Sequence, residues 1–118
     1  MTMTGPFLTL STEGIVPERE TPDAGKIVAG APMFTTWNVE ESPDGKLFAG
    51  VWEATPGTWT ISYDEWEYCR ILSGVSIITD NVGHKRRVTA GDSFILQPGF
   101  AGTWEVVETT RKEYVIRL

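Results

Sequence analysis

The stretch that decides the fold is residues 66–74, which read WEYCRILSG and end in a Ser-Gly turn signal. Side chains alternate between two faces along a β-strand. The face that carries Glu67 also carries Cys69 and Ile71, whereas the other face carries a tyrosine and an arginine. Because Cys and Ile are buried more often than Tyr and Arg, the Glu67 face is predicted to point inward. The alternative is a Glu67 at a solvated strand edge.

The chain beyond residue 33 repeats this pattern in short runs rich in Val, Ile, Thr and aromatic residues. Turn signals such as Gly91-Asp92 and Pro98-Gly99 close the runs, and no helical period persists for three turns. Eight or nine strands at this spacing predict an all-β sandwich or barrel. The expected strands are 34–39, 46–54, 58–63, 66–72, 75–79, 86–90, 93–97, 103–108 and 111–118.

Residues 1–33 differ from the rest because they hold four of the seven prolines and show no sustained hydrophobic period. We expect an irregular arm that lies over the domain or over a partner subunit. Residues 34–118 then form a single barrel. A chain of 118 residues makes one domain and buries about two-thirds of its unfolded surface, which is enough for its own core.

The net charge of −6 argues against nucleic-acid binding, which needs a positive surface. The one basic cluster, 85–87, is expected in a solvated hairpin loop. No leader-like segment and no apolar run of membrane-spanning length is present, so we expect a cytoplasmic protein without a membrane partner. With one His and one Cys, a metal site built on those ligands is nearly excluded, and no cofactor is expected. His84 is predicted to lie on the surface in a turn.

The last predicted strand places Lys112 on the same face as Tyr114 and Ile116. An inward lysine is costly unless it is paired. We therefore predict that Lys112 and Glu67 form an ion pair or a hydrogen bond inside the barrel. The alternative is that the Lys112 ammonium reaches water at the strand end. The cavity around this pair is predicted to be lined by Trp59, Tyr63, Cys69, Trp104 and Tyr114, although alternation alone does not decide whether Trp104 faces inward.

Several of these residues resemble the two motifs of the cupin superfamily. They are Glu67 with the following Ile-Leu-Ser-Gly, then Gly91-Asp92, an apolar run and Pro98-Gly99. More narrowly, residues 34–118 resemble single-domain cupins related to the cupin domain of (S)-ureidoglycine aminohydrolase. The resemblance implies a double-stranded β-helix, that is, a jelly-roll barrel. It also implies a homodimer that pairs through the N-terminal strands.

The chain departs from the cupin pattern at the metal ligands. Of four expected ligands only Glu67 is present, and one carboxylate cannot hold a divalent ion tightly. The histidine positions fall near Ile61 and Tyr63, or Thr60 and Ser62, and near Thr103 or Trp104. We therefore expect a barrel without bound metal, in which a side-chain pair occupies the metal position.

Three functions remain open at this point. The first is a cupin that binds a small polar molecule in its cavity without metal. The second is an isomerase, epimerase or lyase in which Lys112 and Glu67 perform acid/base catalysis. The third is a structural or regulatory subunit whose cavity is filled by aromatic side chains. Cys69 is a less favoured nucleophile, because burial raises the pKa of a thiol.

Overall fold

The computed structural model describes residues 5–118, which form nine β-strands and one short 3-10 helix, so the all-β prediction is confirmed. The first four residues of the predicted arm lie outside this range. In chain order the elements are β1 (Glu18–Glu20), η1 (Ala24–Lys26), β2 (Ile27–Gly30), β3 (Phe34–Glu41), β4 (Leu47–Ala54), β5 (Gly57–Ser62), β6 (Trp66–Asp80), β7 (Lys85–Thr89), β8 (Ser93–Leu96) and β9 (Ala101–Arg117).

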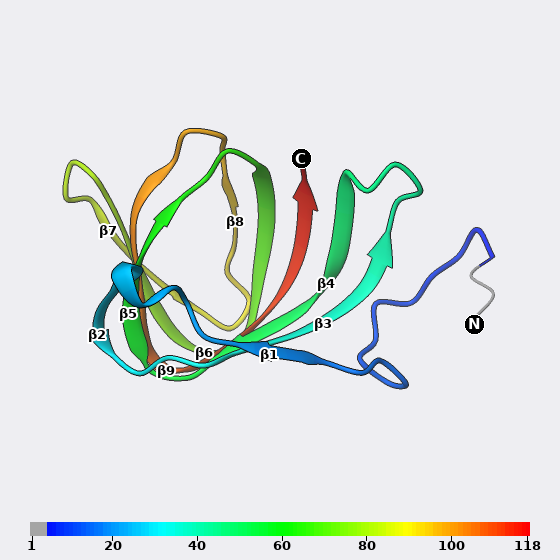
Figure 1. The fold of residues 1–118 in the computed structure, drawn as a ribbon, viewed down its shortest axis with the longest axis horizontal. Helices are drawn as coiled ribbons and strands as arrows, with labels where there is room; N and C mark the ends of the chain where they lie inside the picture. The colour runs from blue at the N-terminus through cyan, green and yellow to red at the C-terminus, as the bar shows by residue number, and fades with distance from the viewer. Residues whose placement is uncertain (1–4) are drawn as a thin grey trace.

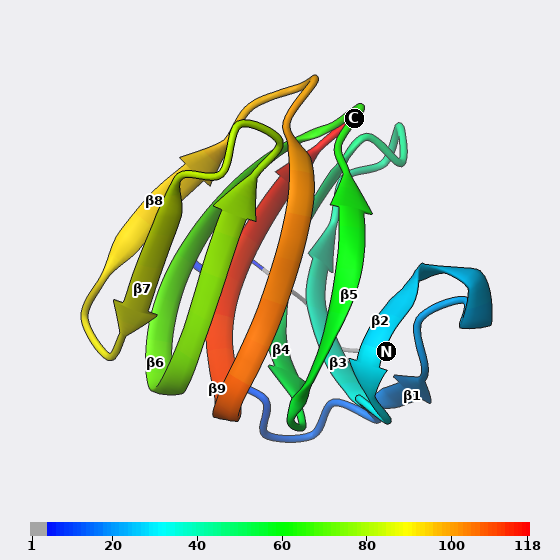
Figure 2. The same cartoon turned by 90° about the vertical axis from the view of Figure 1, so that its left-hand side faces the viewer.

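Two long antiparallel strands, β6 and β9, organise the whole sheet. β9 pairs with β6 along one edge, and with β5 and then β4 along the other edge. β6 in turn pairs with β8 near its start and with β7 near its end. Both long strands bend, so that their halves lie in different walls of a curled jelly-roll sheet (Figure 1). Figure 2 shows β7, β6, β9 and β5 side by side in one wall.

The sequence predicted turns at the places where the two long strands bend. Predicted strands 66–72 and 75–79 are one strand, β6, and the predicted pair 103–108 and 111–118 is also one strand, β9. The Ser-Gly signal instead marks an irregular stretch of the β6–β9 register, where Ser73 pairs with Arg111 and Val75 with Glu108. Bulges of this kind bend a strand without ending its pairing.

The core lies inside the bend and combines buried aliphatic side chains with a group of aromatic ones. Trp104 is 1% exposed, so it faces inward, and its indole nitrogen donates to the Ser76 hydroxyl at 3.1 Å. Ser76 in turn shares a 2.7 Å hydrogen bond with the buried Thr110. Around Trp104 stand Trp52 and Trp59, with ring centroids 5.5 and 6.3 Å away. These contacts tie the bend of the long strands to the aromatic interior.

The predicted arm is more regular than its prolines suggest. β1 pairs with β3, and β2 pairs with β5, so the segment supplies two short strands at the sheet edges. The expectation of an irregular segment is therefore wrong for these residues, since edge strands tolerate nearby prolines. The homodimer expected through this arm stays a prediction. No helix in residues 5–118 is long and apolar enough to cross a membrane.

The basic cluster 85–87 opens β7 rather than lying in a loop, but all three side chains are exposed. His84, in the preceding turn, is also exposed, as predicted, with its Nδ1 3.3 Å from an Asp80 carboxylate oxygen.

We expect Gly74→Ala to destabilise the fold strongly. Gly74 has φ +89°, and a Cβ there would stand 2.0 Å from the Thr109 carbonyl oxygen across the bend. Gly91→Ala is the matched control, because Gly91 has φ +94° with open space around it. Backbone strain should cost about 1–2 kcal/mol at Gly91, and Gly74→Ala should cost clearly more. Urea unfolding measures both free energies, and equal losses would show that close packing at the bend contributes nothing.

Candidate functional site

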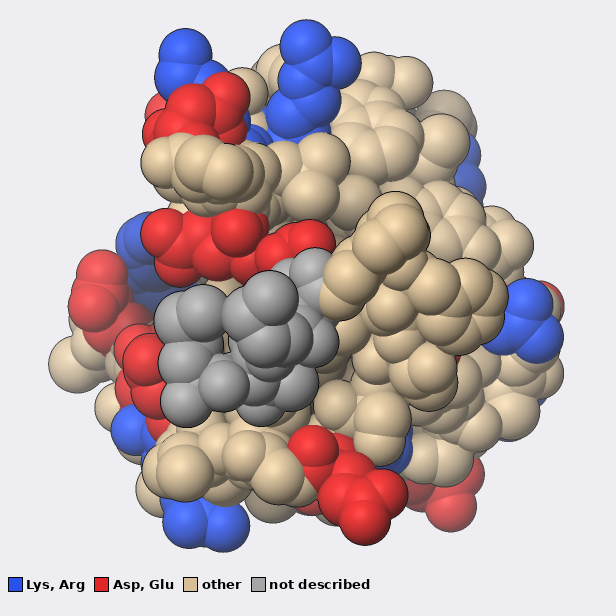
Figure 3. Space-filling view, turned by 90° about the vertical axis from the view of Figure 1, so that its right-hand side faces the viewer, with Lys and Arg blue, Asp and Glu red and all other residues tan. Residues whose placement is uncertain are grey.

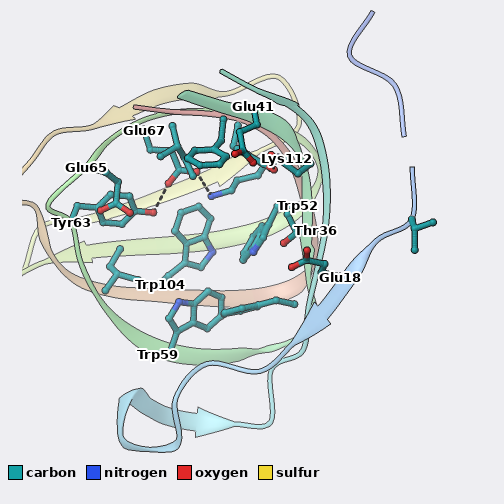
Figure 4. Close-up of a pocket in the computed structure, with 17 residues that line it drawn as sticks. Glu18, Thr36, Glu41, Trp52, Trp59, Tyr63, Glu65, Glu67, Trp104 and Lys112 are labelled. Atoms are coloured by element: carbon teal, nitrogen blue, oxygen red, sulfur yellow. Dashed lines mark hydrogen bonds and ion pairs between the residues drawn. The ribbon is translucent and has the colours of Figure 1, made fainter. Parts of the chain in front are cut away.

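The barrel contains a half-open cavity of about 690 Å³ between its walls. Its aromatic lining comes from Phe34, Phe48, Trp52, Trp59, Tyr63, Trp104 and Tyr114. The charged side chains that line it are Glu18, Glu41, Glu65, Glu67 and Lys112 (Figure 4). The lining is polar and apolar in about equal parts, and a concave site of this size that combines aromatic side chains with polar groups is typical of a small-molecule site.

The polar centre of the cavity is the pair of Glu67 and Lys112. The Lys112 Nζ lies 3.0 Å from Glu67 Oε2, and both side chains are more than nine-tenths buried, so the predicted ion pair is confirmed. The Tyr63 hydroxyl donates to Glu67 Oε1 at 2.5 Å. Both carboxylate oxygens therefore have a partner, which offsets the cost of burying the charge.

The Lys112 ammonium is held by more than its carboxylate partner. It lies 4.5 Å from the ring centroids of both Trp52 and Trp104, within the range of cation–π attraction. It also donates a long hydrogen bond of 3.6 Å to the Cys69 sulfur. The register of β6 and β9 explains this position, because Lys112 pairs with Ile71, and Cys69 and Glu67 follow on the same face of β6. The ammonium is thus enclosed on several sides.

The titratable groups around this pair keep their protons. Burial, and next the charge of Glu67, raises the pKa of Tyr63 above its ordinary value. Burial also raises the pKa of the Cys69 thiol to about 12, although the Lys112 ammonium acts in the opposite direction. Burial alone would lower the pKa of Lys112, but the Cys69 sulfur and the Glu67 carboxylate outweigh it and raise that pKa. At neutral pH the site therefore holds a phenol, a thiol and an ammonium.

The residues of this cavity do not fit a divalent metal ion. Ile61, Tyr63 and Trp104 line the cavity at positions where the cupin resemblance places histidines. Glu67, the one remaining carboxylate of that set, already has a partner for each oxygen, one of them a cation. Within residues 5–118, no group of three or more His, Cys, Asp or Glu side chains is arranged to hold a metal. The side chains of the cavity therefore do not supply the set of ligands that a divalent metal ion needs.

Four of the five predicted lining residues do line the cavity: Trp59, Tyr63, Trp104 and Tyr114. Cys69 does not, because it is fully buried in the wall beside the Lys112 ammonium. Strand alternation correctly predicts that Cys69 faces inward, but it does not distinguish a residue buried within the wall from one at the cavity surface. Whether these residues bind a ligand or catalyse a reaction stays a prediction.

Sequence reasoning missed several lining residues. Trp52 lies on a predicted strand and pairs with Lys112 across β4 and β9, so alternation along 46–54 could have placed it inside. Glu18 was missed for another reason, since it comes from β1 in the segment expected to be irregular. Glu41 lies at the end of β3 and Glu65 just before β6. An acidic residue at such a position usually indicates exposure to solvent, so there was no reason in the sequence to place either residue in the cavity.

We expect the single variants Lys112→Met and Glu67→Leu each to lose about 3–5 kcal/mol of stability, because each leaves a buried charge without its partner. The double variant should lose much less than the sum, since no unpaired charge remains. Urea unfolding gives the coupling energy. The control is the pair of Arg111 in β9 and Glu53 in β4, which lie 3.5 Å apart with side chains about one-third exposed, and its expected coupling is below about 1 kcal/mol. Additive losses at the buried pair would contradict its role.

Stability should fall at alkaline pH. The ordinary pKa values of Cys, Tyr and Lys are 9.0, 10.0 and 10.5, and the native values of Cys69, Tyr63 and Lys112 are all raised. The native state therefore keeps protons that the unfolded chain releases, and stability declines as the pH rises from about 9.

Urea titrations between pH 7 and 11 measure this decline. It should be shallower in Tyr63→Phe, whereas Tyr68→Phe, on the opposite face of β6, should keep the wild-type slope. Stability that stays constant up to pH 11 would count against the buried network.

Comparisons with known proteins agree with this architecture. A crystal structure of a protein of unknown function from Pseudomonas syringae pv. tomato superposes with a TM-score of 0.80 at 22% identity, over 91% of this chain and 46% of that one. The Clostridium difficile EutQ protein superposes with a TM-score of 0.65 at 17% identity, over 93% and 74% of the two chains.

A further structure, from Thermotoga maritima, is 33% identical with a TM-score of 0.53, over 54% of this chain and 73% of that one. No curated protein matches the chain significantly. This chain thus spans less than half the length of the Pseudomonas protein.

The model of the EutQ-like cupin domain matches residues 41–114, which hold most of the strands and the Glu67–Lys112 pair. The match covers well over half of the 118 residues. The chain therefore belongs to the family of EutQ-like cupin domains.

Proposed function

We propose that this cupin binds a small polar molecule in its barrel cavity, without a histidine-bound metal. The observation that carries the proposal is a 690 Å³ cavity that remains open although seven aromatic side chains line it. A barrel filled by its own side chains, as a purely structural subunit would have, leaves no such volume. The ion pair in the wall places polar atoms at a fixed position in the cavity, where they can orient a ligand.

Binding is better supported than acid/base catalysis by Lys112 and Glu67. A general acid or base works best when its pKa lies near the working pH. Here the pKa values of Lys112, Tyr63 and Cys69 are all raised from values already above neutrality. Lys112 would have to break a buried ion pair before it could move a proton. These directions favour a ligand-binding protein over an isomerase, epimerase or lyase.

The closer relation to the cupin domain of (S)-ureidoglycine aminohydrolase, expected from the sequence, stays a prediction. That activity is associated with a metal, and the donor set around Glu67 does not fit one. We therefore propose binding without that reaction.

We expect native mass spectrometry of the untreated protein to show a bound small molecule. Thr36 lines the cavity, so Thr36→Phe should fill part of it and reduce the bound fraction at least fivefold. Its neighbour on the opposite face of β3, Thr35, gives the matched control Thr35→Phe, which should keep the bound fraction. Circular dichroism checks that both variants fold.

Two outcomes would contradict the proposal. One is a wild-type protein without any bound small molecule. The other is a stoichiometric transition metal in elemental analysis of the same sample, since that would make Glu67 a ligand.

A further inference from the structure

We infer that the ligand of this cavity is a small organic cation, an amine in its ammonium form attached to an apolar body. The inference rests on the proposed function and names the chemical class that the cavity selects. It follows from the hydrogen-bond donors, the unpaired charges and the aromatic surfaces of the lining.

The strongest donors of the lining are already committed to neighbouring side chains. The Tyr63 hydroxyl and the Lys112 ammonium both donate to Glu67, and the Tyr114 hydroxyl donates to Asn38 Oδ1 at 2.7 Å. An anionic ligand that accepted from one of these three groups would have to displace its contact, and it would leave Glu67 or Asn38 without that partner. Breaking such a contact in a buried site costs more than the replacement returns. The strongest donors of the lining therefore do not favour an anionic ligand.

The free charges of the lining are all negative. Lys112 is the only cationic side chain that lines the cavity within the described chain, and Glu67 neutralises it. Glu18, Glu41 and Glu65 also line the cavity, and none of them forms an ion pair with another residue of 5–118. Four carboxylates and one ammonium leave a net charge of −3 on the lining. A ligand with a positive charge compensates it.

These three carboxylates do not form one patch. Glu18 belongs to β1, Glu41 ends β3, and Glu65 precedes β6. In Figure 4 they lie on different sides of the cavity, around the tryptophan side chains. Burial raises the pKa of the Tyr114 hydroxyl to about 12, and Glu18 is close enough to add to this rise. The negative charge therefore surrounds the space in which a ligand would lie.

The aromatic walls of the cavity stabilise positive charge as well. The protein itself holds an ammonium group here, 4.5 Å from the rings of Trp52 and Trp104. The remaining wall, where Phe34 meets Trp59 edge to face at 4.7 Å, offers a surface for the apolar body of a ligand. π-faces and carboxylates together are the groups that proteins use to bind organic ammonium ions.

The field outside the cavity has the same sign. Figure 3 shows carboxylate side chains on the left and centre of the arm-side face, and the Lys and Arg side chains mostly near its margin. With a net charge of −6 for the chain, this field attracts cations toward the surface and repels anions.

The test compares three probes of similar shape and different charge: 2-phenylethylamine, 2-phenylethanol and 3-phenylpropanoate. Titrations followed by calorimetry should show the ammonium probe binding at least tenfold more tightly than the alcohol, and the carboxylate binding more weakly than both. Thr36→Phe should remove the binding of the ammonium probe, which locates it in the cavity. Raising the salt concentration should reduce the preference for the cation, because exposed carboxylates are screened.

The double variant Glu18→Gln with Glu41→Gln should weaken binding of the ammonium probe at least threefold and leave the alcohol unchanged. Both side chains are exposed, so the fold should tolerate the change. Glu105→Gln, on the outer face of β9, removes a carboxylate outside the cavity and should have no effect on either probe.

Equal affinities for the amine and the alcohol, or tighter binding of the carboxylate, would overturn the inference and leave the proposed function intact. If none of the probes binds while the untreated protein carries a small molecule, the inference also fails alone. If none binds and no molecule is carried, both proposals fail.

Discussion

The burial of two opposite charges, on Glu67 and Lys112, is the constraint around which the barrel is arranged. Removing such groups from water costs several kcal/mol per ion unless each finds good partners. Here the partners come from two strands and a turn. The Glu67 carboxylate accepts a hydrogen bond from Tyr63, and the Lys112 ammonium lies over the rings of Trp52 and Trp104. The pair therefore holds together the walls that enclose the cavity, and the aromatic residues serve both the charge and the core.

This arrangement depends on the register between β6 and β9. Side chains of opposite parity would point to solvent, so a shift of one residue would move both charges out of the barrel. The irregular pairing near Ser73 and Gly74 lets the strands bend while the register on either side stays correct. The close approach of Gly74 to the Thr109 carbonyl shows how little space the bend leaves. The backbone geometry at one glycine is thus linked to the electrostatics of the cavity.

Much of the fold and the centre of the site could be predicted from the sequence. Strand alternation placed Glu67 and Lys112 inside the barrel. Because an unpaired charge is costly there, the burial of one predicted a partner of opposite charge, which the other supplies. The same reasoning could not separate a bend from a turn, because Ser-Gly and Thr-Thr pairs occur at both. It also could not distinguish Cys69 in the wall from Tyr63 at the cavity surface, since both share the inward parity. The part of the lining supplied by Glu18 depends on a three-residue strand with no periodic signal of its own.

The short strand β1 allows the lining of the cavity to change during evolution with little effect on the fold. β1 pairs with β3 alone, and its three residues are exposed, so they have little part in the core that stabilises the barrel. Yet Val16 and Glu18 contribute to the cavity lining. Substitutions, insertions or exchange of this edge segment can therefore change what the cavity accepts at little cost in folding free energy. A new specificity could evolve at this edge while the charged interior stays the same.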